Sequence, residues 1–137
     1  MMKVIFNLFC IVTFLFLIPQ NAYYAVSLED AEKVENQELK LEKEILNEFN
    51  TSFNLRFDGY EKLSIINLGL LLKRDSSLYD LYEVSANLYK QGTIGEPIIF
   101  LKPTKAYILI KNKDGKKILL TFKKENQRWM ILNAQEK

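Results

Sequence analysis

The sequence predicts an α+β protein in which N-terminal helices pack on a C-terminal antiparallel sheet. Up to Gly92, apolar residues recur every three or four positions, which is typical of helices buried on one face. After Gly92, apolar and polar residues alternate in short runs between turn-forming residues, which is typical of antiparallel strands. Helices followed by strands favour helices that cover one face of a curved, four-stranded meander.

The N-terminal segment differs from the rest of the chain. Residues 4–18 are almost wholly apolar, follow a single lysine and are followed by Pro19. A short basic start, an apolar run of this length and a polar exit are typical of a secretory signal peptide. Small residues at Ala25 and Ser27 favour cleavage before Leu28. We therefore expect residues 1–27 to be a signal peptide and the protein to be exported.

Cleavage would leave residues 28–137 as a single domain in the periplasm or outside the cell. The alternative is an uncleaved chain held at the inner membrane through residues 4–18. A membrane span needs about 20 apolar residues, and this run reaches that length only if Pro19 and the polar residues after it are counted. The single cysteine, Cys10, lies in the apolar run, so the cleaved chain has no thiol.

The first helix is expected to begin at Ser27, whose hydroxyl can cap the helix while acidic residues fill the first turn. Apolar residues at helical spacing follow at Val34, Leu41, Ile45, Phe49 and Phe53. Residues 50–54, which are polar except for Phe53, predict the end of this helix. Alternation at Phe53, Leu55 and Phe57 allows a short strand, and Asp58-Gly59 predicts a turn.

Two further helices are expected. Residues 60–73 are rich in leucine and isoleucine and favour a mostly buried helix, with a strand over residues 68–72 as the alternative. Asp75 is a typical capping residue, and apolar residues at helical spacing follow it from Leu78 onward. Gly92 predicts the end of that helix.

The predicted meander has four strands joined by short turns. The strands are expected at residues 98–102, 106–111, 117–123 and 128–132. The turn that carries Asn112-Lys113-Asp114-Gly115 is the strongest hairpin signal in the chain.

The last predicted strand carries Arg128-Trp129-Met130-Ile131, a tryptophan followed by aliphatic residues. Together with the order of helices and strands, this motif resembles the cystatin-like superfamily, and within it the nuclear-transport-factor-two-like families with small exported bacterial domains. The resemblance implies a cone-shaped fold whose members include isomerases, hydratases, secretion subunits and binding domains. Its enzymes use Asp, His or Tyr residues in a pocket.

The composition argues against catalysis. The chain has no histidine, which excludes Ser-His-Asp and Cys-His catalysis and histidine metal sites. No acidic residue lies within an apolar predicted strand, where its pKa could rise. We therefore expect no enzymatic activity, no cofactor and no metal.

Charge is divided along the chain. Residues 28–60 contain nine acids and four bases, whereas residues 102–137 contain ten bases and three acids. Many of these bases fall at turns and strand ends, where they can also protect sheet edges. A basic hairpin face could bind a protein or an anionic envelope polymer. The candidate residues for that face are Lys111, Lys113, Lys116, Lys117, Lys123, Lys124 and Arg128.

We do not expect a nucleic acid partner, because nine of the ten bases are lysine rather than the fork-shaped arginine that reads bases. These observations favour a non-enzymatic binding or assembly module of a bacterial cell envelope. One alternative is a membrane-anchored subunit of an envelope complex. The sequence does not predict an oligomeric state.

The other alternative is a small-molecule-binding or isomerase-like protein with an apolar pocket. Its expected lining is aromatic: Tyr82, Tyr89, Tyr107 and Trp129. Separately, Asn50-Thr51-Ser52 is a glycosylation sequon with an acid two residues before the asparagine, so Asn50 is a candidate for modification.

Overall fold

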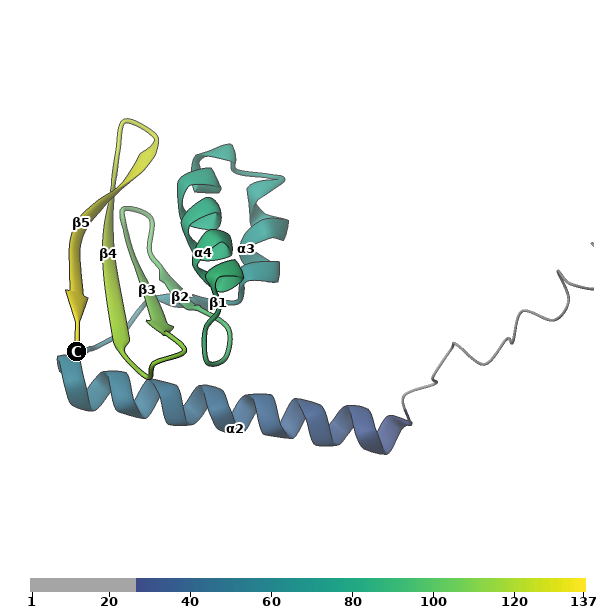
Figure 1. Ribbon diagram of the computed structural model, residues 1–137. Coiled ribbons are helices and arrows are strands. Elements are labelled where there is room, and N and C mark those ends of the chain that lie inside the picture. The colour runs from purple at the N-terminus through teal and green to yellow at the C-terminus, as the bar shows by residue number, and fades with distance from the viewer. Residues whose placement is uncertain (1–26) are drawn as a thin grey trace, which may run out of the picture. The chain divides into compact units, whose positions relative to one another are not determined.

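The computed structural model describes residues 27–137 (Figure 1). The predicted signal segment lies outside the described residues except for Ser27, and Cys10 lies outside them too. The chain divides into two parts, Met1–Glu35 and Asn36–Lys137.

In the first part, the described residues form the start of helix α2 (Leu28–Phe53). The Ser27 hydroxyl accepts a hydrogen bond from the Asp30 backbone N–H at 3.1 Å and donates one to the Asp30 carboxylate at 2.6 Å. Lys33 and Glu29 form an ion pair at 3.0 Å one turn apart. The predicted start of this helix is confirmed.

The second part is built on an antiparallel sheet with strand order β1-β2-β3-β4-β5. The predicted class, α+β with C-terminal antiparallel strands, is confirmed, but the sheet has five strands rather than four. The strands are β1 (Glu61–Leu63), β2 (Ile98–Leu101), β3 (Lys105–Lys111), β4 (Lys117–Glu125) and β5 (Arg128–Glu136). The extra strand is β1, which pairs with β2 in the register Lys62↔Phe100.

The prediction of one helix over residues 60–73 was wrong in its first part. Residues Glu61–Leu63 form β1, and helix α3 (Ile65–Leu72) begins only after Ser64. The Ser64 hydroxyl accepts a hydrogen bond from the Asn67 N–H at 3.1 Å, so Ser64 separates the two elements by capping α3.

The next helix agrees closely with the prediction. Asp75 caps a short 3₁₀ helix, η2 (Ser76–Leu78), by accepting a hydrogen bond from the Ser77 N–H at 3.0 Å. Helix α4 (Tyr79–Gln91) continues directly from it and ends at Gly92, whose φ of 99° suits glycine. Helices α3 and α4 lie side by side beside the sheet (Figure 1).

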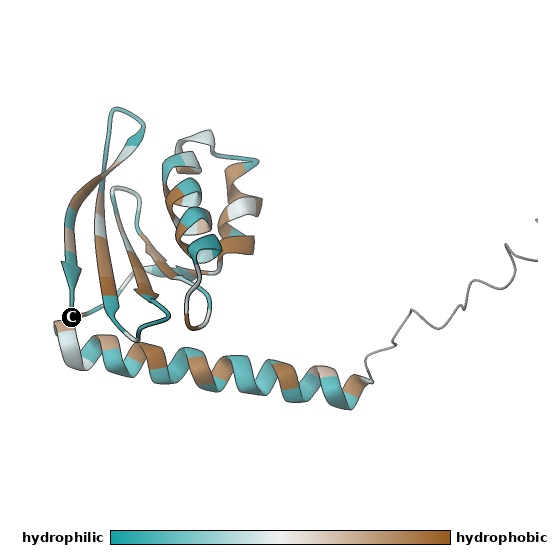
Figure 2. Ribbon diagram, viewed as in Figure 1, coloured by the Kyte–Doolittle hydropathy of each residue, from teal (hydrophilic) through white to brown (hydrophobic). Residues whose placement is uncertain are grey.

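Helices cover both faces of the sheet, which corrects the expectation of helices on one face. Ile99 and Ile108 pack in one core with α3 and α4, whereas Ile98 and Leu109 pack in the other with Ile45 and Phe49 of α2. Neighbouring residues of a strand point to opposite faces, so the two cores lie on opposite sides. Figure 2 shows the hydrophobic residues concentrated in the middle of the central strands, with hydrophilic turns at their ends.

The end of α2 also differs from the prediction. The helix continues through the polar residues 50–52 to Phe53, because Phe49 is fully buried and Phe53 packs against the same core. Leu55 and Phe57 contribute to this core without forming a strand. Asp58-Gly59 forms the expected turn.

Candidate functional site

The seven predicted partner-binding residues lie at two opposite ends of β4 rather than on one face. Lys117 begins β4, whereas Lys123 and Lys124 are close to its end. At about 3.4 Å per residue, six residues of strand separate Lys117 from Lys123 by roughly 20 Å. The structure brings Lys123, Lys124 and Arg128 together at one end, and Lys111, Lys113, Lys116 and Lys117 at the other.

Lysines at the second end, around the β3–β4 hairpin, bind other parts of the protein. Lys111 forms an ion pair of 2.7 Å with Glu48 of α2, and Lys116 forms one of 2.6 Å with Glu136 of β5. The Lys137 ammonium donates a hydrogen bond to the Ser52 carbonyl in the last turn of α2. A cation favours the negative end of a helix, so Lys137 acts together with the Lys111–Glu48 ion pair to hold the second half of α2 on the sheet, whereas Lys116 ties the hairpin to β5.

The end of the sheet that carries Lys123, Lys124 and Arg128 gathers basic residues from three separate segments. We define the basic end as Lys73, Arg74, Lys102, Lys105, Lys123, Lys124 and Arg128. Lys105 and Lys123 are directly opposite each other on β3 and β4. The Lys124 N–H donates to the Thr104 carbonyl at 2.9 Å, and the Lys124 ammonium lies 3.8 Å from the Asp75 carboxylate. The turn after β2, the β4–β5 hairpin and the link after α3 therefore meet here.

Acids at the basic end neutralise only part of this charge. Asp75, Asp80 and Glu125 each pair with one base there, which leaves an excess of four positive charges among the ten groups. Within residues 27–137, four bases of the basic end have no carboxylate within 4.0 Å: Lys73, Arg74, Lys102 and Lys105.

Aromatic rings position three of the lysines. The ammonium groups of Lys102, Lys105 and Lys124 lie 4.3, 5.1 and 5.8 Å from the ring centres of Tyr60, Tyr107 and Trp129. These distances are within the range of cation–π attraction. The neighbouring Tyr107 side chain raises the pKa of Lys105.

One ion pair fixes the β4–β5 hairpin to α4. The Asp80 carboxylate accepts hydrogen bonds from Arg128 Nε at 2.9 Å, Arg128 Nη2 at 3.0 Å and the Trp129 backbone N–H at 3.1 Å. The side-chain hydrogen bond with Arg128 is the largest cause that lowers the pKa of Asp80. Arg128 thus has a structural role, and the free charge of the basic end comes mainly from its lysines and Arg74.

The four aromatic residues predicted to line a pocket do not surround one cavity. Tyr107 packs on the α2 side of the sheet, against Phe57 and Tyr60. Trp129 and Tyr82 pack in the core on the opposite face. The fourth, Tyr89 of α4, is 46% exposed. The sequence alone does not show that Tyr107 and Trp129 lie on opposite faces, because that depends on how β3, β4 and β5 pair.

The sequon lies in a helix rather than in a loop. Asn50 is exposed in the last turns of α2, and the Thr51 hydroxyl donates to the Asn47 carbonyl at 2.9 Å. Modification of Asn50 stays a prediction.

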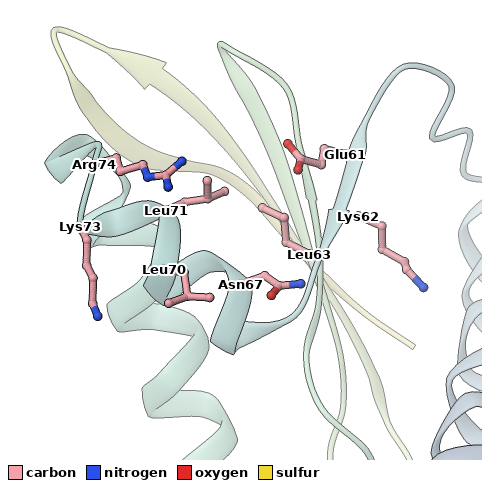
Figure 3. Close-up of a pocket in the computed structure, with 8 residues that line it drawn as sticks. All are labelled: Glu61, Lys62, Leu63, Asn67, Leu70, Leu71, Lys73 and Arg74. Atoms are coloured by element: carbon pink, nitrogen blue, oxygen red, sulfur yellow. The ribbon is translucent and has the colours of Figure 1, made fainter.

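An open pocket of about 450 Å³, which the sequence did not predict, lies between β1 and α3 (Figure 3). The carboxylate of Glu61 and the guanidinium of Arg74 project from opposite walls at one end of the pocket, and Leu63 and Leu71 lie between those walls (Figure 3). The remaining lining residues are Lys62, Asn67, Leu70 and Lys73. Leu70 of α3 is 55% exposed. Its place in this pocket could not be predicted while residues 60–73 were taken as one helix, because the other wall is strand β1.

Residues 27–137 offer neither a metal site nor a membrane span. This region contains no group of three or more Cys, Asp or Glu side chains placed to hold a metal ion. None of its helices is both long enough and apolar enough to cross a membrane.

Comparisons with known proteins give no relative from which a function could be transferred. No protein-family model matches the chain, no curated protein matches it, and no solved structure matches it.

Proposed function

We propose that this protein is a non-enzymatic binding or assembly module that recognises an acidic macromolecule through its basic end. The observation that carries the proposal is the meeting of three chain segments at one end of the sheet, where Lys73, Arg74, Lys102 and Lys105 are free of carboxylate partners among the described residues. Positive charges gathered at one end of a sheet attract an acidic partner and accelerate its association.

The way in which the lysines are held supports binding over simple solvation. A solvated lysine loses side-chain entropy when it binds, and this loss weakens an exposed ion pair. Lys102 and Lys105 already lie over tyrosine rings, so part of that entropy is lost before a partner arrives. Preorganised charges bind more tightly than flexible ones.

The partner that we propose is an acidic protein or an anionic polymer of a bacterial cell envelope. Five of the seven residues of the basic end are lysines, which act as point charges and do not provide the bidentate contacts that read nucleic acid bases. Export rests on the apolar run at residues 4–18. The mass of the protein recovered from its native source tests that part, since a chain beginning at Leu28 excludes a retained anchor.

The cystatin-like resemblance is kept as a proposal about fold ancestry. The order of α3 and α4 before the antiparallel strands β2 to β5 supports it. The position of α2 on the face opposite α3 and α4 departs from the one-sided arrangement that the order of helices and strands predicted.

A fluorescein-labelled decaglutamate peptide is a simple probe of the proposal. Anisotropy titrations would compare the full chain with a K102E/K105E variant and a K113E/K117E variant, which makes the same charge change at the β3–β4 hairpin. We expect K102E/K105E to weaken binding about ten-fold or more, and K113E/K117E to have a much smaller effect. Equal losses in both variants would show that only net charge matters and would contradict the proposal.

A further inference from the structure

The outer edge of β1, which no strand within residues 27–137 pairs with and which we call its free edge, offers a second kind of contact next to the basic end. Glu61 and Leu63 point to one face of the sheet and Lys62 to the other, since neighbouring residues of a strand alternate. All three nevertheless line the pocket. The pocket therefore lies along the free edge of β1 rather than over one face, and α3 forms its other wall.

The hydrogen bonding of the sheet shows which backbone groups face this edge. The Lys102 N–H donates to the Lys105 carbonyl at 2.8 Å, so these residues form a hydrogen-bonded pair between β2 and β3. Such pairs alternate along an antiparallel ladder, so Ile99 and Leu101 direct their backbone groups to β1. Their partners there are Leu63 and Glu61. Lys62, between them, directs its backbone N–H and C=O to the free edge.

The opposite edge of the sheet is less suited to pairing. The β4–β5 register shifts between Thr121 and Phe122, and such an irregularity bends an edge strand away from new partners. In addition, the Trp129 N–H is already bonded to Asp80. The edge of β1 has neither feature.

We infer that the partner binds as an extended peptide that adds a sixth strand to β1, antiparallel to it. This inference rests on the proposed function, and it specifies the partner as an acidic polypeptide. A peptide residue opposite Leu63 would place an apolar side chain on the wall formed by Leu63, Leu70 and Leu71. The backbone of the next residue would pair with the free N–H and C=O of Lys62, as in other cases of strand addition beside a helix.

Charge selects the residues in the C-terminal half of the peptide. An acidic residue opposite Glu61 is disfavoured, because like charges directly opposite each other in a sheet repel. The antiparallel direction then carries the C-terminal end of the peptide past Glu61 to Arg74 and Lys102. Acidic residues are favoured there, since neither base has a carboxylate partner within residues 27–137.

The probe is a fluorescein-labelled peptide, Thr-Leu-Thr-Gln-Glu-Glu, acetylated and amidated apart from the dye. Its leucine is designed to lie opposite Leu63, its second threonine opposite Lys62 and its glutamates near Arg74. Two changed probes test the two contacts: N-methylation of the second threonine removes the N–H that would pair with the Lys62 carbonyl, and lysines replace the glutamates in the other. We expect each change to weaken binding to the full chain about five-fold or more.

Protein variants with matched controls complete the test. K62P removes the edge N–H, whereas K62A removes only the side chain and its ion pair with Glu42. L70D places a charge on the pocket wall, whereas I66D places one on the same helix at a residue outside the pocket. We expect K62P and L70D to lose binding and K62A and I66D to retain it, with thermal melts confirming that each variant folds.

The outcomes separate this inference from the proposed function. If K102E/K105E weakens decaglutamate binding but neither K62P nor N-methylation affects the peptide, the basic end binds acids and strand addition is wrong. If no variant affects either probe, both proposals are wrong. A chain that is dimeric in light scattering and becomes monomeric as K62P would make a second copy the occupant of the edge, which also overturns the peptide assignment.

Discussion

The carboxylate of Asp80 joins α4 to the start of β5, and its removal gives the sharpest stability prediction. It accepts three hydrogen bonds, two from the Arg128 guanidinium and one from the Trp129 backbone N–H. Its side chain is only 18% exposed, whereas that of Arg128 is 75% exposed. Because solvent screens the Arg128 side of the pair, most of the loss in D80A should come from the Trp129 N–H and the start of the helix.

The magnitude is set by those two contributions. A hydrogen bond to a charged group contributes about 1.5–3 kcal/mol, and an acid in the first turn of a helix adds about 0.3–1 kcal/mol. We therefore expect D80A to lower the free energy of unfolding by about 2–4 kcal/mol. For a domain of about 100 residues, this corresponds to a fall in Tm of roughly 10–30 °C.

The chain provides its own reporter for the assay. Trp129 is the single tryptophan and is 5% exposed, so its fluorescence reports urea unfolding at the site itself. R128M should cost less than D80A, because Asp80 still accepts from the Trp129 N–H in that variant. D114N, in the exposed β3–β4 hairpin, is the matched control. Destabilisation by R128M equal to that by D80A, or a D80A variant no less stable than D114N, would refute this reasoning.

Three further predictions concern the second part of the chain, Asn36–Lys137. F49A should lower stability by about 3–5 kcal/mol in urea melts because Phe49 is fully buried between α2 and the sheet, and a loss below about 1 kcal/mol would show that α2 does not pack there. G95A should destabilise the protein more than G115A. Both glycines have positive φ, but a Cβ at Gly95 would lie 2.9 Å from Ile45 Cδ1, whereas a Cβ at Gly115 meets nothing within 4 Å. Equal losses of stability in thermal melts would contradict the contact with Ile45. Hydrogen bonding with Ser77 lowers the pKa of Asp75, and the side-chain hydrogen bond with Arg128 lowers the pKa of Asp80, so both carboxylates predict acid sensitivity. Their stabilisation is complete above the ordinary pKa of 3.8 and is lost as pH falls through the lower folded-state values, so unfolding free energies of a D75N/D80N variant should vary less with pH below about 4 than those of the parent chain.

Local signals in the sequence predicted much of the fold. The Ser27 cap, the Gly92 end of α4 and the hairpin at residues 112–115 depend on neighbouring residues, and all three are found in the structure. Strand β1 depends instead on pairing with β2, more than 30 residues away. Three residues are too few to show an alternating pattern, so the local sequence favours a helix there.

The placement of helices on both faces has a readable signal in the sequence. Ile98-Ile99-Phe100 and Ile108-Leu109-Ile110 are apolar at consecutive positions, which is typical of strands buried on both faces. The candidate site is harder to predict. Charge counting finds the lysines, but only the strand register shows that β4 carries them to opposite ends, where one group holds α2 and the other is left with an excess of positive charge.

Carbodiimide coupling of decaglutamate to the full chain tests the central claim most directly, because it joins a carboxylate to whichever lysine it contacts. Peptide mapping by mass spectrometry then identifies the coupled lysines. We expect coupling at Lys102 and Lys105, with little at Lys113 and Lys117, and loss of coupling in high salt. Coupling concentrated at Lys113 and Lys117, or spread evenly over the exposed lysines, would contradict the basic end as the binding site.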